Sequence, residues 1–224
     1  MDSLDPEELL TKLAHHQSLS TEEVSSVLNT LKLWGKDDKA REISLDDLFN
    51  FLVVCKKANL KEHHRLIANF LNLHDALTVS FVLELLCIDW QLSAEYLEHA
   101  VSISIGVSWD SEGDAREQGL RILGEYLRSF NLERMLKTDS KPRKIQTNEK
   151  EVLNLLFSTL EDQSNNPFVR QAAYIAICRG FGKDWEYLPG ECVLLDFDMP
   201  SENVDTNLLN EARRFIDLLG PQSS

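Results

Sequence analysis

The stretch "SNNPFVRQAAYIAICRGFG" (residues 164–182) joins a polar opening to a run of small and apolar residues at near-helical spacing. Asn165 and Asn166 precede Pro167, and proline is favoured in the first turn of a helix, where its missing N–H costs nothing. The pattern predicts a helix at about residues 167–181. It also places an arginine, Arg170, at the start of that apolar helix, which calls for an explanation.

Similar helix-start signals recur along the chain. Asp5, Ser20 and Ser44 each precede a first turn that holds acidic residues, the pattern typical of helix N-caps. Apolar residues follow at helical spacing, so we expect four helices before residue 75. "ALTVSFVLELLCIDW" (76–90) is apolar nearly all round and predicts a central, buried helix. Further helices are expected at about 94–107, 114–130, 148–161, 167–181 and 205–219.

The expected fold class is therefore all-α. Nine glycines and six prolines are few for a β-protein with many tight turns, and "ECVLLDF" (191–197) is the single plausible strand. We expect one helical domain over 1–224, with N-terminal helices in 1–60, helix pairs in 61–183, and a loop with a final helix in 184–224. Between Trp185 and Asp205 helical periodicity is lost, which predicts a long loop that wraps the end of the helical stack.

Two helix openings resemble each other. "DAREQGLRILGEYL" begins at Asp114 and "FVRQAAYIAICRGF" at Phe168. In both, an arginine (Arg116, Arg170) is followed three positions later by a small residue (Gly119, Ala173) and then by apolar residues. Each follows a shorter amphipathic segment, so the repeating unit is helix, short polar turn, helix.

This pairing resembles HEAT-type α-solenoid repeats, whose second helix commonly begins with Asp, then Val-Arg, then Ala. "NNPFVRQAAYIAI" (165–177) and "GDAREQGLRIL" (113–123) carry the resemblance, which covers about 60–182. It implies an irregular stack of helical hairpins, because a hairpin cannot bury its apolar face alone. Arg116 and Arg170 are then expected to be structural, with the side-chain stem along the next unit and the guanidinium on a free carbonyl or an acid there.

The charge balance restricts the partners. The 23 basic and 37 acidic residues give a formal net charge of −14, which repels phosphate backbones. We therefore expect no nucleic-acid partner and favour a basic protein partner, whose encounter this field would accelerate. The densest basic stretch, "KTDSKPRK" (137–144), is short and interrupted by proline, as expected for a solvated loop.

The cysteines and the start of the chain favour the cytoplasm. Cys55, Cys87, Cys178 and Cys192 are scattered, and the N-terminus is acidic where a signal peptide would be basic. No apolar run approaches the roughly 18 residues of a membrane span, so no membrane association is expected. We expect reduced, buried thiols.

Signatures of catalysis and of metal or nucleotide binding are missing from the sequence. The pairs His15–His16 and His63–His64 are adjacent residues, whose side chains point in different directions on a helix. Glu95 and His99 are spaced i,i+4 and could share a metal, but no second motif completes such a site. "GFGKDW" (180–185) follows a helix rather than a strand, which indicates a helix C-cap. We predict no enzyme activity, no cofactor and no metal.

The densest group of acids lies near the C-terminus. Asp196 and Asp198, with Glu186 and Glu191 nearby, are candidates for contact with a basic partner or a divalent cation, and Trp185 is a candidate interface anchor. The alternative is a solvated loop. The oligomeric state is not evident from the sequence.

The favoured function is protein–protein interaction, as an adaptor or binding module with an acidic concave face. Its most specific form is a bacterial immunity-type protein that masks a basic toxin, which suits the charge and size. The alternative is an enzyme, either a metal-dependent hydrolase based on Asp196 and Asp198 or a HEAT-like nucleic-acid-processing enzyme. HEAT-like DNA glycosylases need a basic groove, and this chain is acidic.

Overall fold

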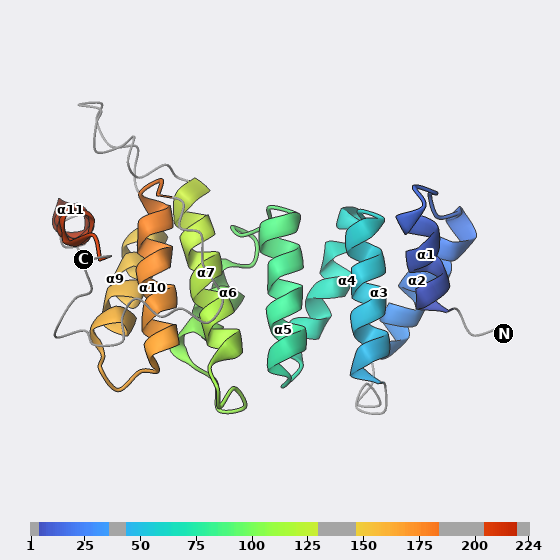
Figure 1. Ribbon diagram of the computed structural model, residues 1–224, viewed down its shortest axis with the longest axis horizontal. Helices are drawn as coiled ribbons and strands as arrows, with labels where there is room; N and C mark the ends of the chain where they lie inside the picture. The colour runs from blue at the N-terminus through green and yellow to red at the C-terminus, as the bar shows by residue number, and fades with distance from the viewer. Residues whose placement is uncertain (1–4, 36–43, 130–146, 184–203, 219–224) are drawn as a thin grey trace. The chain divides into compact units, whose positions relative to one another are not determined.

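The computed structural model describes residues 5–35, 44–129, 147–183 and 204–218 (Figure 1). Within these ranges the regular structure is helical and contains no β-strand, which confirms the all-α class. The candidate strand at 191–197 lies outside them, as does the long loop expected between Trp185 and Asp205 apart from its last residues.

Contacts between residues group the chain into two compact units, Met1–Gln91 and Leu92–Ser224. The first unit carries 15 acidic and nine basic residues, and the second carries 22 acidic and 14 basic residues, so both are acidic. The single-domain organisation expected from the sequence stays a prediction.

The first unit begins with three amphipathic helices, α1 (Pro6–Ala14), α2 (Thr21–Trp34) and α3 (Leu45–Lys57). Ser20 and Glu23 form the expected capping box, with the Glu23 N–H donating to Ser20 Oγ at 3.2 Å and the Ser20 N–H to Glu23 Oε2 at 2.6 Å. Ser44 occupies the N-cap position of α3, but its side chain makes no capping hydrogen bond. The helix start there was predicted correctly, and the capping bond was not.

Short helical segments and a longer apolar helix complete this unit. A 3₁₀ turn (Lys61–His63), α4 (His64–Ala68) and a second 3₁₀ turn (Asn69–Asn72) precede α5 (Ala76–Leu83), which continues as a π-helix (Glu84–Asp89). α1 packs along α3, and α2 packs against α3 and α4. The core is formed by fully buried aliphatic and aromatic side chains, among them Val27, Leu31, Leu52, Ile67, Phe70 and Val82.

The segment 76–90 differs from its expectation in one respect. Val79, Val82 and Leu83 are fully buried, as the sequence predicts, but the Leu77 side chain is 71% exposed. The segment is thus a helix with a buried face and an exposed apolar face, and the expectation of burial all round is wrong for the exposed face.

The second unit contains α6 (Leu97–Ile105), α7 (Asp114–Ser129), α9 (Thr147–Glu161), α10 (Pro167–Gly180) and α11 (Thr206–Leu218). These match the expected ranges, except that α6 begins at Leu97 after a turn. α7 packs extensively along α10, and each packs against the helix before it, α6 or α9. Gly124 allows the backbones of α7 and α10 to approach each other closely, because a Cβ at this position would lie only 2.7 Å from the Ala176 Cα.

The end of α10 confirms the helix-cap interpretation of "GFGKDW". The Lys183 N–H donates to the Cys178 carbonyl and the Gly182 N–H to the Arg179 carbonyl, both at 3.0 Å. Gly182 adopts φ 78°, a left-handed conformation that suits glycine and that this capping motif requires. The segment is a helix terminus and not a phosphate-binding loop.

Candidate functional site

The five residues predicted to bind a partner lie outside the described ranges. They are Trp185, Glu186, Glu191, Asp196 and Asp198. Their part in binding stays a prediction. Asp205, at the end of the same acidic stretch, pairs with Lys183, and its N–H donates to the Tyr174 hydroxyl at 2.8 Å.

The two repeat arginines make equivalent contacts. Arg116 Nε donates to the Ser104 carbonyl at 2.9 Å, and Arg170 Nε donates to the Leu160 carbonyl at 3.0 Å. Ser104 and Leu160 are the penultimate residues of α6 and α9, so each arginine bonds a carbonyl in the last turn of the preceding helix. Such carbonyls have no partner within their own helix. Arg116 also reaches the next helix pair, through Nη1 to Asn165 Oδ1 at 2.7 Å.

The small residues of the repeat are close-packing positions. A Cβ on Gly119 would lie 2.7 Å from Ser104 Oγ and 3.0 Å from the Ala100 carbonyl oxygen, so α7 and α6 touch there. Ala173, at the corresponding place on α10, is fully buried. The arginine and the small residue thus recur 54 positions apart, and each arginine bonds a carbonyl of the preceding helix.

A polar pocket of about 460 Å³ lies between the α6–α7 and α9–α10 turns. Asp110, Arg116 and Asn165 contribute to its wall. Arg116 already donates hydrogen bonds to groups on both sides of the pocket. Burial lowers the pKa of its guanidinium, and the negative charges of Asp162 and Asp110 partly oppose this shift. Asp110 Oδ2 accepts the Arg116 N–H at 2.9 Å. These polar groups hold the turns together, which is a structural role.

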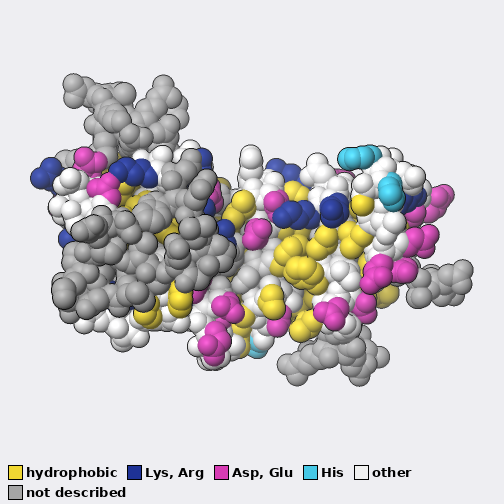
Figure 2. Space-filling model, in the orientation of Figure 1, with side chains coloured by type: hydrophobic (Ala, Val, Ile, Leu, Met, Phe, Trp, Pro, Cys, Tyr) yellow, Lys and Arg dark blue, Asp and Glu magenta, His cyan; other side chains and the backbone are white. Residues whose placement is uncertain are grey.

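A different surface, on the first unit, exposes apolar side chains. Leu45 and Phe49 on α3 are 54% and 39% exposed, Leu77 on α5 is 71% exposed, and Phe81 is half-buried. The rings of Phe49 and Phe81 lie 4.4 Å apart between centroids, so the two helices contribute to one surface. We call these four residues the α3–α5 face. Figure 2 shows hydrophobic side chains gathered over α3 and α5.

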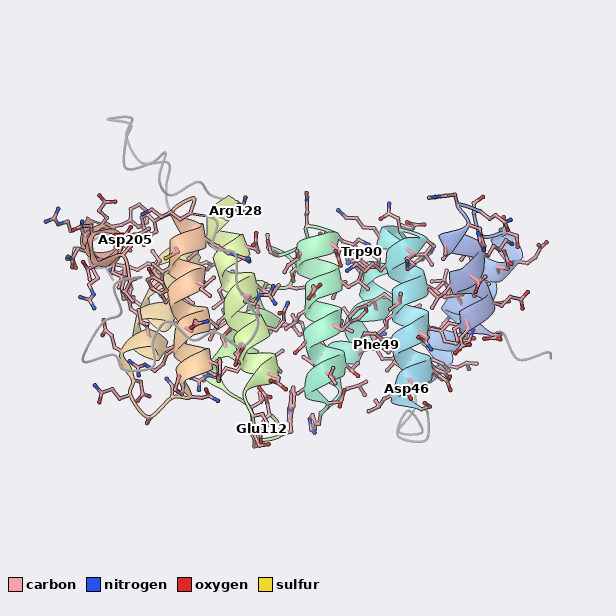
Figure 3. All side chains as sticks on the ribbon, viewed as in Figure 1. Asp46, Phe49, Trp90, Glu112, Arg128 and Asp205 are labelled. Atoms are coloured by element: carbon pink, nitrogen blue, oxygen red, sulfur yellow. The ribbon has the colours of Figure 1, made fainter. Side chains whose placement is uncertain are left out.

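Charged groups border the α3–α5 face. Asp46 and Asp47 directly follow Leu45, are exposed, and form no ion pair among the described residues. Figure 3 places Asp46 at the lower end of α3 and Phe49 between α3 and α5. Lys56 lies 6.0 Å from the centre of the Phe81 ring, and its Nζ pairs with Asp89 at 2.7 Å and Glu84 at 3.8 Å. The Lys56 charge is therefore already opposed.

The α3–α5 face is not among the sites predicted above, although the sequence holds a signal for it. "LDDLF" (45–49) and "LTVSF" (77–81) each place a leucine and a phenylalanine four residues apart. Residues i and i+4 share one side of a helix. The buried positions of the same helices hide this pattern, because α5 is apolar at nearly every position.

The described residues offer little for metal or thiol chemistry. They contain no group of three or more His, Cys, Asp or Glu side chains arranged to hold a metal ion. Cys55, Cys87 and Cys178 are buried and free, and their reduced state in the cell stays a prediction. Burial raises the pKa of Cys55 to about 12 and that of Cys178 to about 11, so both stay protonated at neutral pH and are poor nucleophiles. Cys192 lies outside the described ranges.

Over the described part of the chain, no helix combines the length and apolar character needed to cross a membrane. Comparisons with protein-family models, with curated proteins and with solved structures find no match for this chain.

Proposed function

We propose that this protein is a protein–protein interaction module with an acidic binding surface, built from HEAT-like helical hairpins. The observation that carries the proposal is the α3–α5 face, an aromatic pair and two exposed leucines next to the exposed carboxylates of Asp46 and Asp47. Clustered, exposed apolar side chains with a polar rim are typical of protein-binding sites.

The HEAT-like part of the proposal is supported by two features of the units. Arg116 and Arg170 bond the last turns of the helices that precede their own. Alternate helices also pack side by side, α1 with α3 in one unit and α7 with α10 in the other. Side-by-side packing of alternate helices is expected where helical hairpins stack on one another.

Covering the exposed leucines of the α3–α5 face would favour binding. Leu77 and Leu45 hold most of their surface in water, and burying a leucine side chain fully is worth about 1.5–3 kcal/mol. A protein partner that covers the face recovers this free energy for binding. The aromatic pair adds large, rigid contact area, and aromatic residues are common anchors of interfaces.

The charge of the molecule favours a basic partner. The net charge of −14 and the exposed Asp46 and Asp47 attract cationic surfaces. Asp196 and Asp198 would add to this attraction. An adaptor that recruits a basic protein and an immunity-type protein that masks one are both consistent with this surface, and the small size of the chain suits the second.

The test is capture of partners by matched variants. The wild-type chain, the double variant Leu45→Ser/Leu77→Ser and the control Leu33→Ser are immobilised and exposed to lysate of the source cells. Leu33 is 70% exposed but lies on α2, outside the face, so its variant loses an exposed leucine elsewhere on the same unit. We expect a basic protein that the wild type and Leu33→Ser retain and the double variant loses. Equal capture by all three would remove the α3–α5 face as the binding site.

A further inference from the structure

The four residues of the α3–α5 face form two short rows on neighbouring helices. Leu45 and Phe49 make one row along α3, and Leu77 and Phe81 make the other along α5. Figure 3 labels Asp46 at the lower end of α3 and Trp90 towards the upper end of the α5 segment, so both helices run in the same direction. The leucines therefore lie at one level and the phenylalanines one turn higher.

The surface recognises side chains rather than backbone. In α3 and α5 the backbone N–H and C=O groups bond within the helix, so no strand edge is available to pair with an extended peptide. This excludes strand addition, and among the other common modes of peptide recognition a helix that lays an apolar stripe on an apolar surface suits two parallel rows of leucine and phenylalanine. A helix with apolar residues at i, i+4 and i+7 presents a stripe that matches the two rows.

The charges next to the face favour some binding partners over others. A second copy of the chain carries the same net charge of −14 and an anionic bilayer is also negative, so the acidic charge of the chain, with Asp46 and Asp47 beside the face, disfavours both occupants. A helix with lysine or arginine beside its apolar stripe would place those cations near the two aspartates.

We propose that the α3–α5 face binds an amphipathic α-helix of a partner protein, with aliphatic anchors along one side and basic residues at its edge. The inference rests on the proposed function and adds the form and chemistry of the bound segment. The leucines of the partner contact Phe49, Phe81 and Leu77, and its cations lie near Asp46 and Asp47.

The test uses three synthetic peptides of about 14 residues, each about 21 Å long as a helix. The first carries leucines at i, i+4, i+7 and i+11 with lysines at the edges of the stripe. The second has the same composition in an order that spreads the leucines around the helix. The third replaces the lysines by glutamates. Binding of labelled peptides to the full chain is measured by fluorescence anisotropy at low and physiological salt.

We expect the first peptide to bind at least about tenfold more tightly than the other two. The second peptide lacks a continuous row of apolar anchors, and the third lacks charge complementarity to the two aspartates. Leu45→Ser/Leu77→Ser should weaken its binding by about tenfold or more, while Leu33→Ser leaves it unchanged. The double variant Asp46→Asn/Asp47→Asn keeps the apolar rows. It should reduce the difference in affinity between the lysine peptide and the glutamate peptide. Circular dichroism of each variant checks that the helices are intact.

Other outcomes overturn the inference in distinguishable ways. If the shuffled peptide binds as well as the amphipathic one, the occupant is not a helix, although capture of a protein through the face would still support the proposed function. If the wild type is a dimer that Leu45→Ser/Leu77→Ser converts to monomer, a second copy covers the face. Leu77-dependent sedimentation with anionic lipid vesicles would assign the face to a membrane. Loss of both peptide binding and face-dependent capture would refute the proposed function as well.

Discussion

At the scale of single residues, Arg116 and Arg170 explain why an arginine stands at the start of an apolar helix. Each carries its charge to the end of the antiparallel neighbour, where a carbonyl lacks an intrahelical partner. A cation near a helix C-terminus also interacts favourably with the helix dipole. The side chain of Arg170 is buried, so its contact is protected from competition with water.

Replacing Arg170 with alanine should lower the free energy of unfolding by roughly 1–3 kcal/mol, because the Leu160 carbonyl loses a buried donor. Urea unfolding of the purified chain measures this change. Arg170→Lys keeps the charge but not the planar guanidinium, and it should recover only part of the loss. An unchanged unfolding midpoint in Arg170→Ala would contradict the structural role.

Glu117 predicts a specific pH dependence of stability. Burial, followed by the negative charges of Asp114 and Asp110, raises its pKa from 4.5 to about 7. The folded state therefore holds a proton that the unfolded state releases, so the contribution of Glu117 to stability falls as pH rises from about 4.5 to 7. The side chain that Glu117→Gln introduces cannot ionise, so the free energy of unfolding of this variant should change less between about pH 4.5 and 7.

Unfolding midpoints in urea between pH 4.5 and 8 test the Glu117 prediction. Glu112→Gln serves as the control, because it removes an exposed glutamate from the turn before the same helix. If Glu117→Gln and the wild type lose stability in parallel over this pH range, Glu117 is not the group responsible.

At the scale of the helices, the second unit depends on the close packing of α7 against α10. Gly124 faces Ala176 so closely that no side chain fits between the two backbones. Arg179 and Glu125 form an ion pair across the same two helices at 2.7 Å. Gly124 fixes the separation of α7 and α10, and the ion pair fixes their register.

Gly124→Ala should destabilise the protein by about 1–3 kcal/mol, since the added methyl group must push α7 away from α10. In an isolated helix the same change would be stabilising by about 1 kcal/mol. Thermal unfolding together with far-ultraviolet circular dichroism measures stability and helix content. A higher melting temperature than that of the wild type would show that the two helices can separate without cost.

The sequence predicts the helices well, because their caps and apolar spacing are local properties. Ser20 and Glu23 form a capping box only three residues apart, and Gly182 ends α10 through bonds within the last turn. The α3–α5 face depends instead on which helices become neighbours. Since α5 is apolar nearly all round, its sequence alone does not indicate that Leu77 is the exposed position.

At the scale of the whole molecule, both units share the acidic charge. Acidic residues exceed basic ones by six in Met1–Gln91 and by eight in Leu92–Ser224. Such a charge is not needed for folding and costs some self-repulsion, which agrees with the proposal that the protein binds a basic partner.

The association rate with the captured basic partner should therefore fall steeply as salt rises, because exposed charges are screened beyond about 8 Å at physiological ionic strength. Asp196→Lys/Asp198→Lys should slow association at low salt and leave the melting temperature unchanged. Stopped-flow mixing over a salt series measures both effects. Wild-type association rates in this variant would show that the two aspartates are solvated surface only.

Hydrogen–deuterium exchange of the chain, free and bound to the captured partner, tests the α3–α5 face most directly. We predict slower exchange in the bound state for amides of α3 (Leu45–Lys57) and of the α5 segment (Ala76–Asp89), and no such change in the Leu45→Ser/Leu77→Ser variant mixed with the same partner. Protection confined to residues 92–224, with exchange in α3 and α5 unaltered, would contradict the assignment of the binding surface.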